Sequence, residues 1–452
     1  MSHDTETDPQ PFDPLDPALL AKARHIAEAI PEGGLFAEKA WRISPIPLFL
    51  TKREAKALDR LGPQLLKFQQ VSDTIYRRSR KARLPEWISA TLDQGKPPEL
   101  LELGLTASVV EQTPRVIRPD LILTDDGFIA SELDSVPGGI GLTAWLADVY
   151  SDDTDPNRNV IGGREGMIKG FGQLFGGRGA DIAVSEEASD YRPEMDWIRD
   201  RLGDDWSVVD AESYSPTDRP VYRFFELFDL PNLIGGRTIS EAAAAGTIDL
   251  TAPIKPWLEE KAWSALFWSL PLRELWKREL RESNWRRLCE IFPRSWIVDP
   301  AEVPPHAGIP GLDIQHFEDL SGFTQTEREL VLKLSGFDER AWGSRSVTMG
   351  HDVSAEDWGK AVDEALSSYG TSPFVLQRFH AGRIIKHPWW NPETDQLELM
   401  EGRARLCPYY FIDPTRPRET RLGGILATIC PSDKKILHGM SDAILVPCAV
   451  GS

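Results

Sequence analysis

Apolar residues in the first quarter of the chain recur at intervals of three and four positions, the spacing of one helix face. The clearest run is Leu58, Leu61, Leu65, Leu66 and Phe68. The pattern predicts helices over residues 19–29, 52–78, 84–92 and 100–105. Residues 17–110 are therefore expected to form a mostly helical N-terminal region. The acidic, proline-rich residues 1–16 lack this pattern and are predicted to be a disordered tail.

The apolar pattern changes to that of strands after residue 110. Residues 115–124 are rich in Val, Ile and Leu, and a second apolar run starts at Phe128. Asp125-Asp126-Gly127 lies between them, and glycine readily takes the positive φ of a tight turn. We expect a β-hairpin with a three-residue loop, in which Thr124 pairs with Phe128. A glycine-rich turn and a helix over residues 142–150 follow.

Residues 161–240 alternate between predicted strands and a helix. Short strands are expected over residues 181–184 and 206–210, with an amphipathic helix over residues 193–202 between them. A third strand is expected over residues 220–227. This alternation is typical of a small Rossmann-like α/β unit.

Residues 241–452 combine further helices and strands. Residues 258–288 carry apolar, Trp-rich helical faces, and Ser354 is a suitable N-cap for a helix over residues 355–367. Strands are predicted over residues 330–333, 346–349, 374–379 and 397–411, and Gly423-Gly424 opens a last structured segment. The whole pattern predicts an α+β protein.

Composition narrows the classes of partner. The 452 residues hold 51 Lys and Arg against 70 Asp and Glu, a net charge of −19. That balance argues against nucleic acid or an anionic membrane as a general partner. No apolar run of about 18 residues predicts a membrane span, and no secretory signal is visible. Cys289, Cys407, Cys430 and Cys448 have no metal-binding spacing, so we expect buried thiols in a cytoplasmic protein.

The hairpin carries the strongest candidate chemistry. Residues two apart on a strand share a face, and the expected register places Asp120 opposite Glu132. One face would then hold Arg118, Asp120, Glu132 and Asp134. Clustered carboxylates repel each other unless a cation offsets them, and Mg²⁺ prefers oxygen ligands together with substrate phosphates. A solvent-exposed face with ordinary acidic residues is the alternative.

A second segment has the residue types of a phosphate-binding loop. Lys333 ends a predicted strand, and Gly336 and Gly343 follow in a loop whose N–H groups could contact phosphate oxygens. Arg340 and Arg345 could assist. An ordinary hairpin is the alternative explanation.

Three further residues are weaker candidates. Lys255 and Lys261 lie just before or on a predicted helix, where they could face phosphates or belong to a solvated surface. Gln377 lies on an apolar strand of the kind that presents backbone groups to adenine. A plain core strand is the alternative there.

The order of these features resembles the circularly permuted ATP-grasp family, which includes the synthetase domain of glutathionylspermidine synthase. The carboxylate hairpin comes first, then the lysines, the apolar strand with Gln377 and the Arg-rich strand over residues 402–411. The match is most specific at Arg118-Pro119-Asp120 and Glu132-Leu133-Asp134, where the family has Asn in place of Asp134. Around Lys261 and Lys333 the match is looser, with Glu260 in place of an Asn and Gly343-Ser344-Arg345 in the loop.

The resemblance implies a circularly permuted ATP-grasp fold that uses ATP and Mg²⁺. Residues 111–160 would form its metal-binding hairpin and residues 241–452 its nucleotide-binding part. The implied metal ligands are Asp120, Glu132 and Asp134. The implied nucleotide contacts are Lys255, Lys261, Lys333, Gly336, Gly343, Ser344, Arg345 and Gln377. Arg118 and Arg405 would stabilise the transferred phosphoryl group, with Arg403 a rival for Arg405.

The implied reaction joins a small-molecule carboxylate to an amine through an acyl phosphate. A catalytically idle nucleotide-binding protein and a kinase-like phosphoryl transferase are the alternatives, and an unrelated α/β protein is a third. The substrates and the oligomeric state stay open. Residues 434–440, with Lys434 and His438, could form a basic wall of a substrate pocket.

Overall fold

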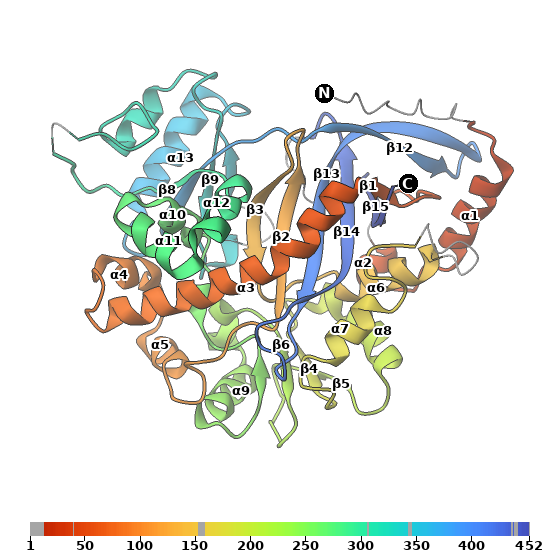
Figure 1. Ribbon diagram of the computed structural model, residues 1–452, viewed down its shortest axis with the longest axis horizontal. Helices are drawn as coiled ribbons and strands as arrows, with labels where there is room; N and C mark the ends of the chain where they lie inside the picture. Colours follow the sequence, from red (N-terminus) through yellow and green to blue (C-terminus); the bar gives the residue numbers. More distant parts are fainter. Residues whose placement is uncertain are drawn as a thin grey trace.

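The computed structural model describes residues 13–38, 40–151, 159–304, 307–341, 346–434, 437 and 442–451. Three β-sheets form its framework (Figure 1). The largest has the order β1-β15-β14-β13-β2-β3, with β12 paired to the first half of β13. Its strands are β1 (Leu48–Leu50), β2 (Val116–Leu123), β3 (Phe128–Asp134), β12 (Ile384–Asn391), β13 (Gln396–Phe411), β14 (Arg421–Pro431) and β15 (Ile444–Val450).

The N-terminal region is helical, with one exception. Its helices are α1 (Pro17–Glu28), α2 (Gly34–Ala37), α3 (Lys52–Arg80), α4 (Trp87–Asp93) and α5 (Pro98–Gly104). Helix α3 crosses the large sheet (Figure 1), and Gly62 permits the contact because a Cβ there would lie 2.5 Å from Tyr410. The exception is β1, which pairs in parallel with β15. Of the predicted tail, residues 1–12 lie outside the described residues, and Asp16 caps α1.

The second sheet is parallel and matches the predicted Rossmann-like alternation. Its strands are β4 (Asp181–Val184), β5 (Ser207–Asp210), β6 (Val221–Phe224) and β7 (Leu250–Thr251), in the order β5-β4-β6-β7. Helices α8 (Arg192–Leu202) and α9 (Ile234–Ala245) belong to this unit, while α6 (Ile140–Tyr150) and α7 (Gly166–Gly172) contact β14 of the large sheet. Strand β7 lies beyond the predicted boundary at residue 240. The strand order reverses between β4 and β6, where ligands commonly bind beyond the carboxyl ends of the strands.

The third sheet is antiparallel, in the order β10-β9-β11-β8. Its strands are β8 (Ser295–Ile297), β9 (Leu330–Leu334), β10 (Val347–Met349) and β11 (Phe374–Arg378). Helix α13 (Ala355–Ser367) begins where predicted, because the Ser354 hydroxyl accepts the Asp357 amide at 3.0 Å. Figure 1 shows α13 beside this sheet, away from the parallel sheet.

The predicted helical stretch over residues 258–288 is divided into three helices. They are α10 (Ala262–Trp268), α11 (Arg273–Leu280) and α12 (Glu282–Ile291). Pro271 lies between the first two and has no N–H to continue a helix. Arg281 separates the last two with φ +68°. The apolar spacing located the helical residues correctly but did not show these breaks.

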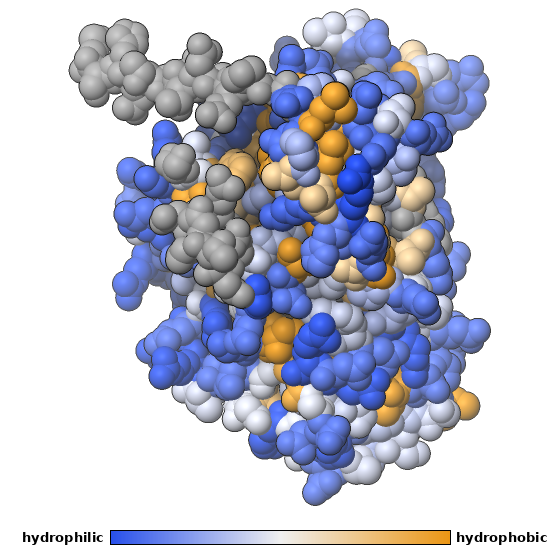
Figure 2. Space-filling view, turned by 90° about the vertical axis from the view of Figure 1, so that its right-hand side faces the viewer, coloured by the Kyte–Doolittle hydropathy of each residue, from blue (hydrophilic) through white to orange (hydrophobic). Residues whose placement is uncertain are grey.

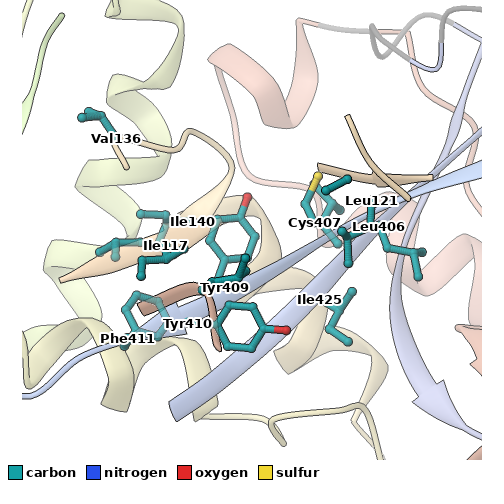
Figure 3. Close-up of a cluster of buried hydrophobic side chains, with 14 of the residues drawn as sticks. Ile117, Leu121, Val136, Ile140, Leu406, Cys407, Tyr409, Tyr410, Phe411 and Ile425 are labelled. Carbon is teal, nitrogen blue, oxygen red and sulfur yellow. The ribbon is translucent and has the colours of Figure 1, made fainter. Parts of the chain in front are cut away.

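Strand β13 runs through the centre of the largest core (Figure 3). Tyr409 and Tyr410 are fully buried, and each hydroxyl has a partner. Tyr409 donates to the Gly138 carbonyl at 2.7 Å, and Tyr410 donates to the Leu58 carbonyl at 2.6 Å. Because a buried hydroxyl without a partner is costly, these bonds fix α3 and the loop after β3 against the sheet.

The four cysteines are free, and three of them are buried as expected, while Cys289 is half-buried. The side of the molecule in Figure 2 is mostly polar, with apolar residues in small separate groups. No helix in the described parts of the chain is long and apolar enough to cross a membrane.

Candidate active site

A cavity of about 650 Å³ lies where the three sheets meet. One wall comes from β2, β3 and β13, a second from β9, β10 and β11, and the loops after β4 and β6 close one end. Most of the predicted site residues line it: Arg118, Asp120, Glu132, Asp134, Lys261, Lys333, Gly336, Gln377, Arg403 and Arg405. The fold therefore brings together segments that are far apart in the sequence.

The β2–β3 hairpin is present, but its register beside the turn is one place from the predicted one. Leu123, rather than Thr124, pairs with Phe128. The Thr124 amide donates to the Gly127 carbonyl at 2.9 Å and closes a loop over residues 124–127. By itself, this shift of one place would give every charged residue the wrong cross-strand partner.

A β-bulge at Ser131 restores the predicted pairs. The register shifts after Asp120, so one residue of β3 has no direct partner on β2. Beyond the bulge the partners are Asp120 with Glu132 and Arg118 with Asp134. The predicted pairs are thus confirmed, whereas the predicted three-residue loop is wrong. The shift at the turn and the shift at the bulge cancel each other. The alternation of apolar and polar residues along the strands does not reveal either shift.

Arg118 and Arg405 neutralise two of the three carboxylates. Arg118 Nε lies 3.0 Å from Asp120 Oδ1, and Arg118 Nη2 lies 3.1 Å from Asp134 Oδ2. Arg405 Nη1 lies 3.0 Å from Asp120 Oδ2. Burial alone would lower the pKa of Arg118, but Asp120 and Asp134 raise it well above its ordinary value. For Asp134, burial raises the pKa despite the nearby Arg118.

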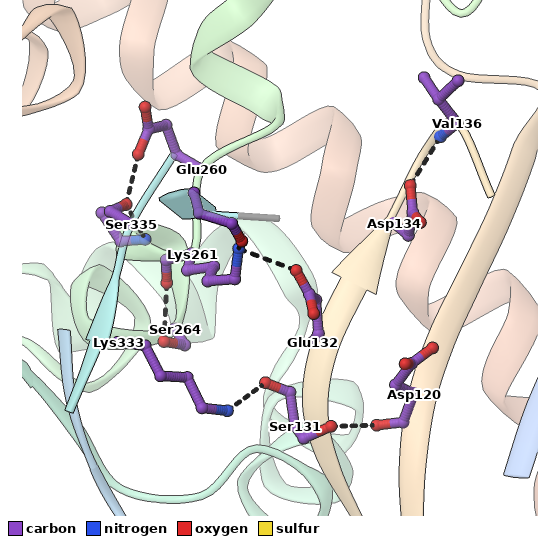
Figure 4. Close-up of polar contacts among 12 residues, drawn as sticks. Asp120, Ser131, Glu132, Asp134, Val136, Glu260, Lys261, Ser264, Lys333 and Ser335 are labelled. Atoms are coloured by element: carbon purple, nitrogen blue, oxygen red, sulfur yellow. Dashed lines mark hydrogen bonds and ion pairs between the residues drawn. The ribbon is translucent and has the colours of Figure 1, made fainter. Parts of the chain in front are cut away.

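Lys261 and Lys333 reach across the cavity from the opposite wall to β3 (Figure 4). Lys261 Nζ lies 2.9 Å from Glu132 Oε1 and 3.1 Å from the Ala341 carbonyl. The Glu132 side chain is 42% accessible, but the surface it exposes lines the cavity. Burial would raise the pKa of Glu132, and Lys261 outweighs that effect and lowers it. Glu132 is therefore ionised at neutral pH.

Lys333 contacts the bulge of β3. Its ammonium donates to the Ser131 carbonyl at 3.0 Å and to Gln377 Oε1 at 2.9 Å. The other end of the Gln377 amide, Nε2, lies 3.4 Å from Ser295 Oγ. Burial lowers the pKa of Lys333 to about 8. The bulge thus gives Lys333 a partner that a regular strand would keep in its own ladder.

Lys255 does not belong to this site, which corrects the prediction. Its ammonium is buried away from the cavity, 3.1 Å from Asp73 Oδ1, and donates to the carbonyls of Val110 and Gln112 at 2.8 and 2.6 Å. It joins α3 to the segment after α5. Arg340, a weaker candidate, instead pairs with Asp338 and Glu364 near the surface.

The structure describes only part of the predicted phosphate loop. Gly343, Ser344 and Arg345 lie outside the described residues. Gly336 lines the cavity, but its lack of a side chain has a packing reason, since a Cβ would lie 2.9 Å from the Glu259 carbonyl oxygen. Of residues 434–440, Leu437 lines the cavity and Lys434 pairs with Asp442 at 3.4 Å.

The end of the cavity beyond β4 and β6 is acidic, which the sequence reasoning missed. Glu187 follows β4, Glu226 follows β6, and Asp229 and Glu259 lie beside them. Burial and the neighbouring Glu259 raise the pKa of Glu226 well above its ordinary value. The available signal was the position of Glu226 directly after a buried strand of a parallel sheet, at the edge where ligands bind.

A second missed carboxyl group is Glu194 of α8. It is fully buried and accepts the amides of Gly139 at 2.7 Å and Leu142 at 3.0 Å. Burial raises its pKa to about 7. Glu194 therefore occupies the N-terminus of α6, where the glycine-rich turn would otherwise offer amides to a phosphate.

The carboxylates suit a magnesium ion that also binds phosphates. Among the described residues, no three His, Cys, Asp or Glu side chains lie close enough to hold a metal ion by themselves. Mg²⁺, however, commonly takes only one or two protein carboxylates and completes its shell with water and phosphate oxygens. Glu132 and Asp134 face the cavity and meet that requirement, while Asp120 is 5% exposed and held by two arginines.

Comparison with known proteins finds a similar fold among solved structures. No family model matches the sequence, and no curated protein matches it. Among solved structures, a glutathione synthetase-like effector from Globodera pallida is similar, with TM-score 0.52 and 9% identity over 96% of this chain and 95% of that chain. At this identity the likeness shows a shared fold.

A second solved structure is a protein provisionally described as a gamma-glutamylcysteine synthetase, from Methylobacillus flagellatus KT. Its TM-score is 0.39 and its identity 10%, over 88% of this chain and 89% of that chain.

Proposed function

We propose that this protein is a Mg-ATP-dependent ligase that activates a carboxylate as an acyl phosphate and joins it to an amine. One observation carries the proposal: two lysines from one wall and paired carboxylates and arginines from the other converge on one cavity. The fold shared with a glutathione synthetase-like protein supports it. The ATP-grasp assignment, its circular permutation and a cytoplasmic location belong to the same proposal.

The nucleotide has a suitable place between the two walls. Val331, Val347 and Met349 come from the antiparallel sheet and Ile122 and Ile129 from the hairpin, and all line the cavity. An adenine ring fits between such apolar faces, and Gln377 would lie near its edge. The triphosphate would then extend toward the lysines, because a flexible ammonium readily binds phosphate.

The charged residues have separate roles in this proposal. Lys261 and Lys333 hold the phosphates, and Glu132 and Asp134, with Asp120 behind them, hold the metal. Bound Mg²⁺ would offset the charge that develops on the phosphate oxygens. Arg118 and Arg405 orient the transferred group. Phosphoryl transfer depends mainly on such positioning and charge neutralisation.

The reaction would take two steps. A substrate carboxylate oxygen bonds to the γ-phosphorus of ATP as the bond to the ADP oxygen breaks. The amine nitrogen then bonds to the acyl carbon, and inorganic phosphate leaves with the electrons of the broken C–O bond. The acidic end of the cavity suits an ammonium group, and an ionised carboxylate there can accept the proton that the nitrogen releases.

Hydroxylamine trapping tests this function. Purified protein is incubated with Mg-ATP, hydroxylamine and a panel of amino acids, peptides and dicarboxylates, and hydroxamate, ADP and AMP are measured. We expect ADP and hydroxamate in equal amounts for at least one carboxylate. AMP and pyrophosphate would contradict the proposal, because they indicate adenylation. ADP formed with a hydroxyl compound and no hydroxamate would favour a kinase-like transfer instead.

A further inference from the structure

Three buried side chains connect the segments that carry Lys261 and Lys333. The Glu260 carboxylate contacts the Lys96 ammonium on one side and the Ser335 hydroxyl on the other. The side chains of Lys96 and Glu260 are 0% and 1% exposed, and Ser335 is fully buried. None of the three lines the cavity.

The backbone completes the connection. Ser335 Oγ accepts the Ala262 amide at 2.8 Å, and the Ser335 carbonyl accepts the Lys261 amide at 3.1 Å. The start of α10 is thus bound to the end of β9. Lys261 directly follows Glu260, and Lys333 lies two residues before Ser335 (Figure 4). These bonds therefore set the spacing between the two lysine backbones.

Close packing leaves this connection little freedom. A Cβ at Gly336 would lie 3.0 Å from the Glu260 carboxyl carbon, so the loop after β9 lies directly on that carboxylate. Lys96 also lies 5.5 Å from the centre of the Phe337 ring. A buried ion pair is a poor source of net stability, since desolvation offsets its attraction. The Lys96–Glu260 ion pair is better explained by a role in positioning the two segments that it joins.

We propose that Lys96, Glu260 and Ser335 form a clamp that sets the distance between the Lys261 and Lys333 ammonium groups for one polyphosphate ligand. The three are positioning residues, because they act through the two lysines. The proposal rests on the proposed function insofar as the ligand is a nucleotide. The effect of the clamp on Lys261 can be measured without any ligand.

The sharpest variant is Ser335→Ala, with Ser79→Ala as its control. Ser335→Ala removes the hydroxyl between Glu260 and Ala262 and leaves both charges in place. Ser79 is equally buried, donates to the Pro85 carbonyl at 2.7 Å and accepts the Ser89 amide at 3.0 Å. The control removes a comparable buried hydroxyl in the N-terminal region, so melting temperatures should fall similarly in both variants.

The first measurement uses the ligand-free protein. Acetic anhydride at a low dose modifies lysines, and mass spectrometry gives the rate at Lys261. We expect Ser335→Ala to raise this rate several-fold and Ser79→Ala to leave it at the wild-type value. An unchanged rate in Ser335→Ala, or an equal rise in both variants, would overturn the clamp whatever the protein binds.

The second measurement is the calorimetric Kd for Mg-ADP. We expect Ser335→Ala to weaken binding about tenfold, the effect of losing one buried hydrogen bond, and Ser79→Ala to change it less than twofold. Equal Kd values in wild type and Ser335→Ala would contradict the clamp. Failure of the wild type to bind Mg-ADP would instead contradict the proposed function, and the Lys261 labelling would still decide the spacing.

A charge-removing pair separates the hydrogen bond from the ion pair. In Lys96→Met/Glu260→Gln both charges are absent, and the side-chain amide introduced at position 260 can still accept the Ser335 hydroxyl. We expect wild-type Lys261 labelling in the double variant and raised labelling in Lys96→Met alone, which leaves Glu260 buried without its cation. Raised labelling in the double variant equal to that of Ser335→Ala would show that the hydrogen bond does not set the spacing.

Discussion

The two walls of the cavity hold their charges in different ways. On the large sheet, Arg118, Asp120 and Arg405 neutralise each other within the wall, and all are largely buried. On the antiparallel sheet side, Lys261 and Lys333 each have one partner on their own side and one on the opposite wall, at Glu132 and Ser131. The Arg118–Asp120–Arg405 group is therefore neutralised within its own wall, whereas the charge of Lys261 is neutralised from across the cavity.

This difference indicates which groups a ligand can recruit. A cation inserted at Glu132 and phosphates placed between the walls would replace the Lys261–Glu132 contact and leave both charges paired. Drawing Arg118 and Arg405 away would leave the buried Asp120 without a cation, which is far more costly. We expect the lysine wall to adjust on binding and the sheet wall to keep its geometry.

The largest expected effect is from Glu132→Ala, which removes the residue that both walls share. We expect Mg-ATP turnover to fall by about 10³-fold, the upper range for losing one preorganised electrostatic group. The fold should be retained, because this carboxylate faces the cavity. ADP release measures turnover, and Asp125→Ala, an exposed carboxylate on the same hairpin, is the control. Wild-type turnover in Glu132→Ala would show that the metal assignment is wrong.

The next comparison sets Lys333 against Lys255. We expect Lys333→Ala to lower turnover by about 10²-fold with little change in melting temperature, because it loses a phosphate contact. Lys255→Ala should do the opposite. The Lys255→Ala variant loses one of the cations beside the buried Asp73, which should lower the free energy of unfolding by about 3 kcal/mol. Its affinity for Mg-ADP should stay at the wild-type value. Thermal melts and calorimetry separate the two, and equal affinity in wild type and Lys333→Ala would make this loop an ordinary hairpin.

Arg405 and Arg403 give a smaller contrast on the sheet wall. Both lie on β13 and line the cavity, but Arg403 donates to the carbonyls of Gly382, at 3.1 Å, and Ser432. Since those bonds occupy its guanidinium group, we expect Arg403→Ala to lower turnover only a few-fold and Arg405→Ala about tenfold more. The reverse order of kcat values would transfer the phosphoryl-stabilising role to Arg403.

The smallest effect concerns pH. Burial lowers the pKa of Lys333 from 10.5 to about 8, so its ammonium loses its proton as the pH rises through that value. Affinity for Mg-ADP should fall about threefold between pH 7.5 and 8.5. The unfolded chain keeps the Lys333 proton up to about pH 10.5, whereas the folded protein releases it near pH 8. The free energy of unfolding should therefore rise with pH between about 8 and 10.5. Lys333→Arg should remove the change in affinity, and a flat profile in the wild type would contradict the assignment.

Local pattern predicted the parts of the molecule that have local causes. Helix α3 follows from apolar spacing, and helix α13 begins after its predicted N-cap, Ser354. The hairpin follows from its Asp-Gly turn, and its position placed the carboxylates in the cavity. Within the site, Lys333 was found from the glycines that follow it, Lys261 from its place at a predicted helix and Gln377 from its apolar strand, and all three line the cavity.

Features with distant causes were not predictable. Lys255 has the same sequence context as Lys261, and only Asp73, far along the chain, decides that it is structural. The bulge at Ser131 depends on how β3 meets β2. Strand β12, with Pro388 and two tryptophans, was not recognised, although proline is compatible with an edge strand.

The pairing of β1 with β15 has a consequence for synthesis of the chain. Leu48 pairs with Cys448, which is 448 − 48 = 400 positions later. The hairpin that carries the carboxylates likewise pairs with β13, whose residues follow it by more than 250 positions. A ribosome must therefore deliver almost the whole sequence before either edge is covered, and until then β2 exposes a row of unpaired amides to other nascent chains. Chaperone capture during translation should thus be strongest before residue 411 emerges.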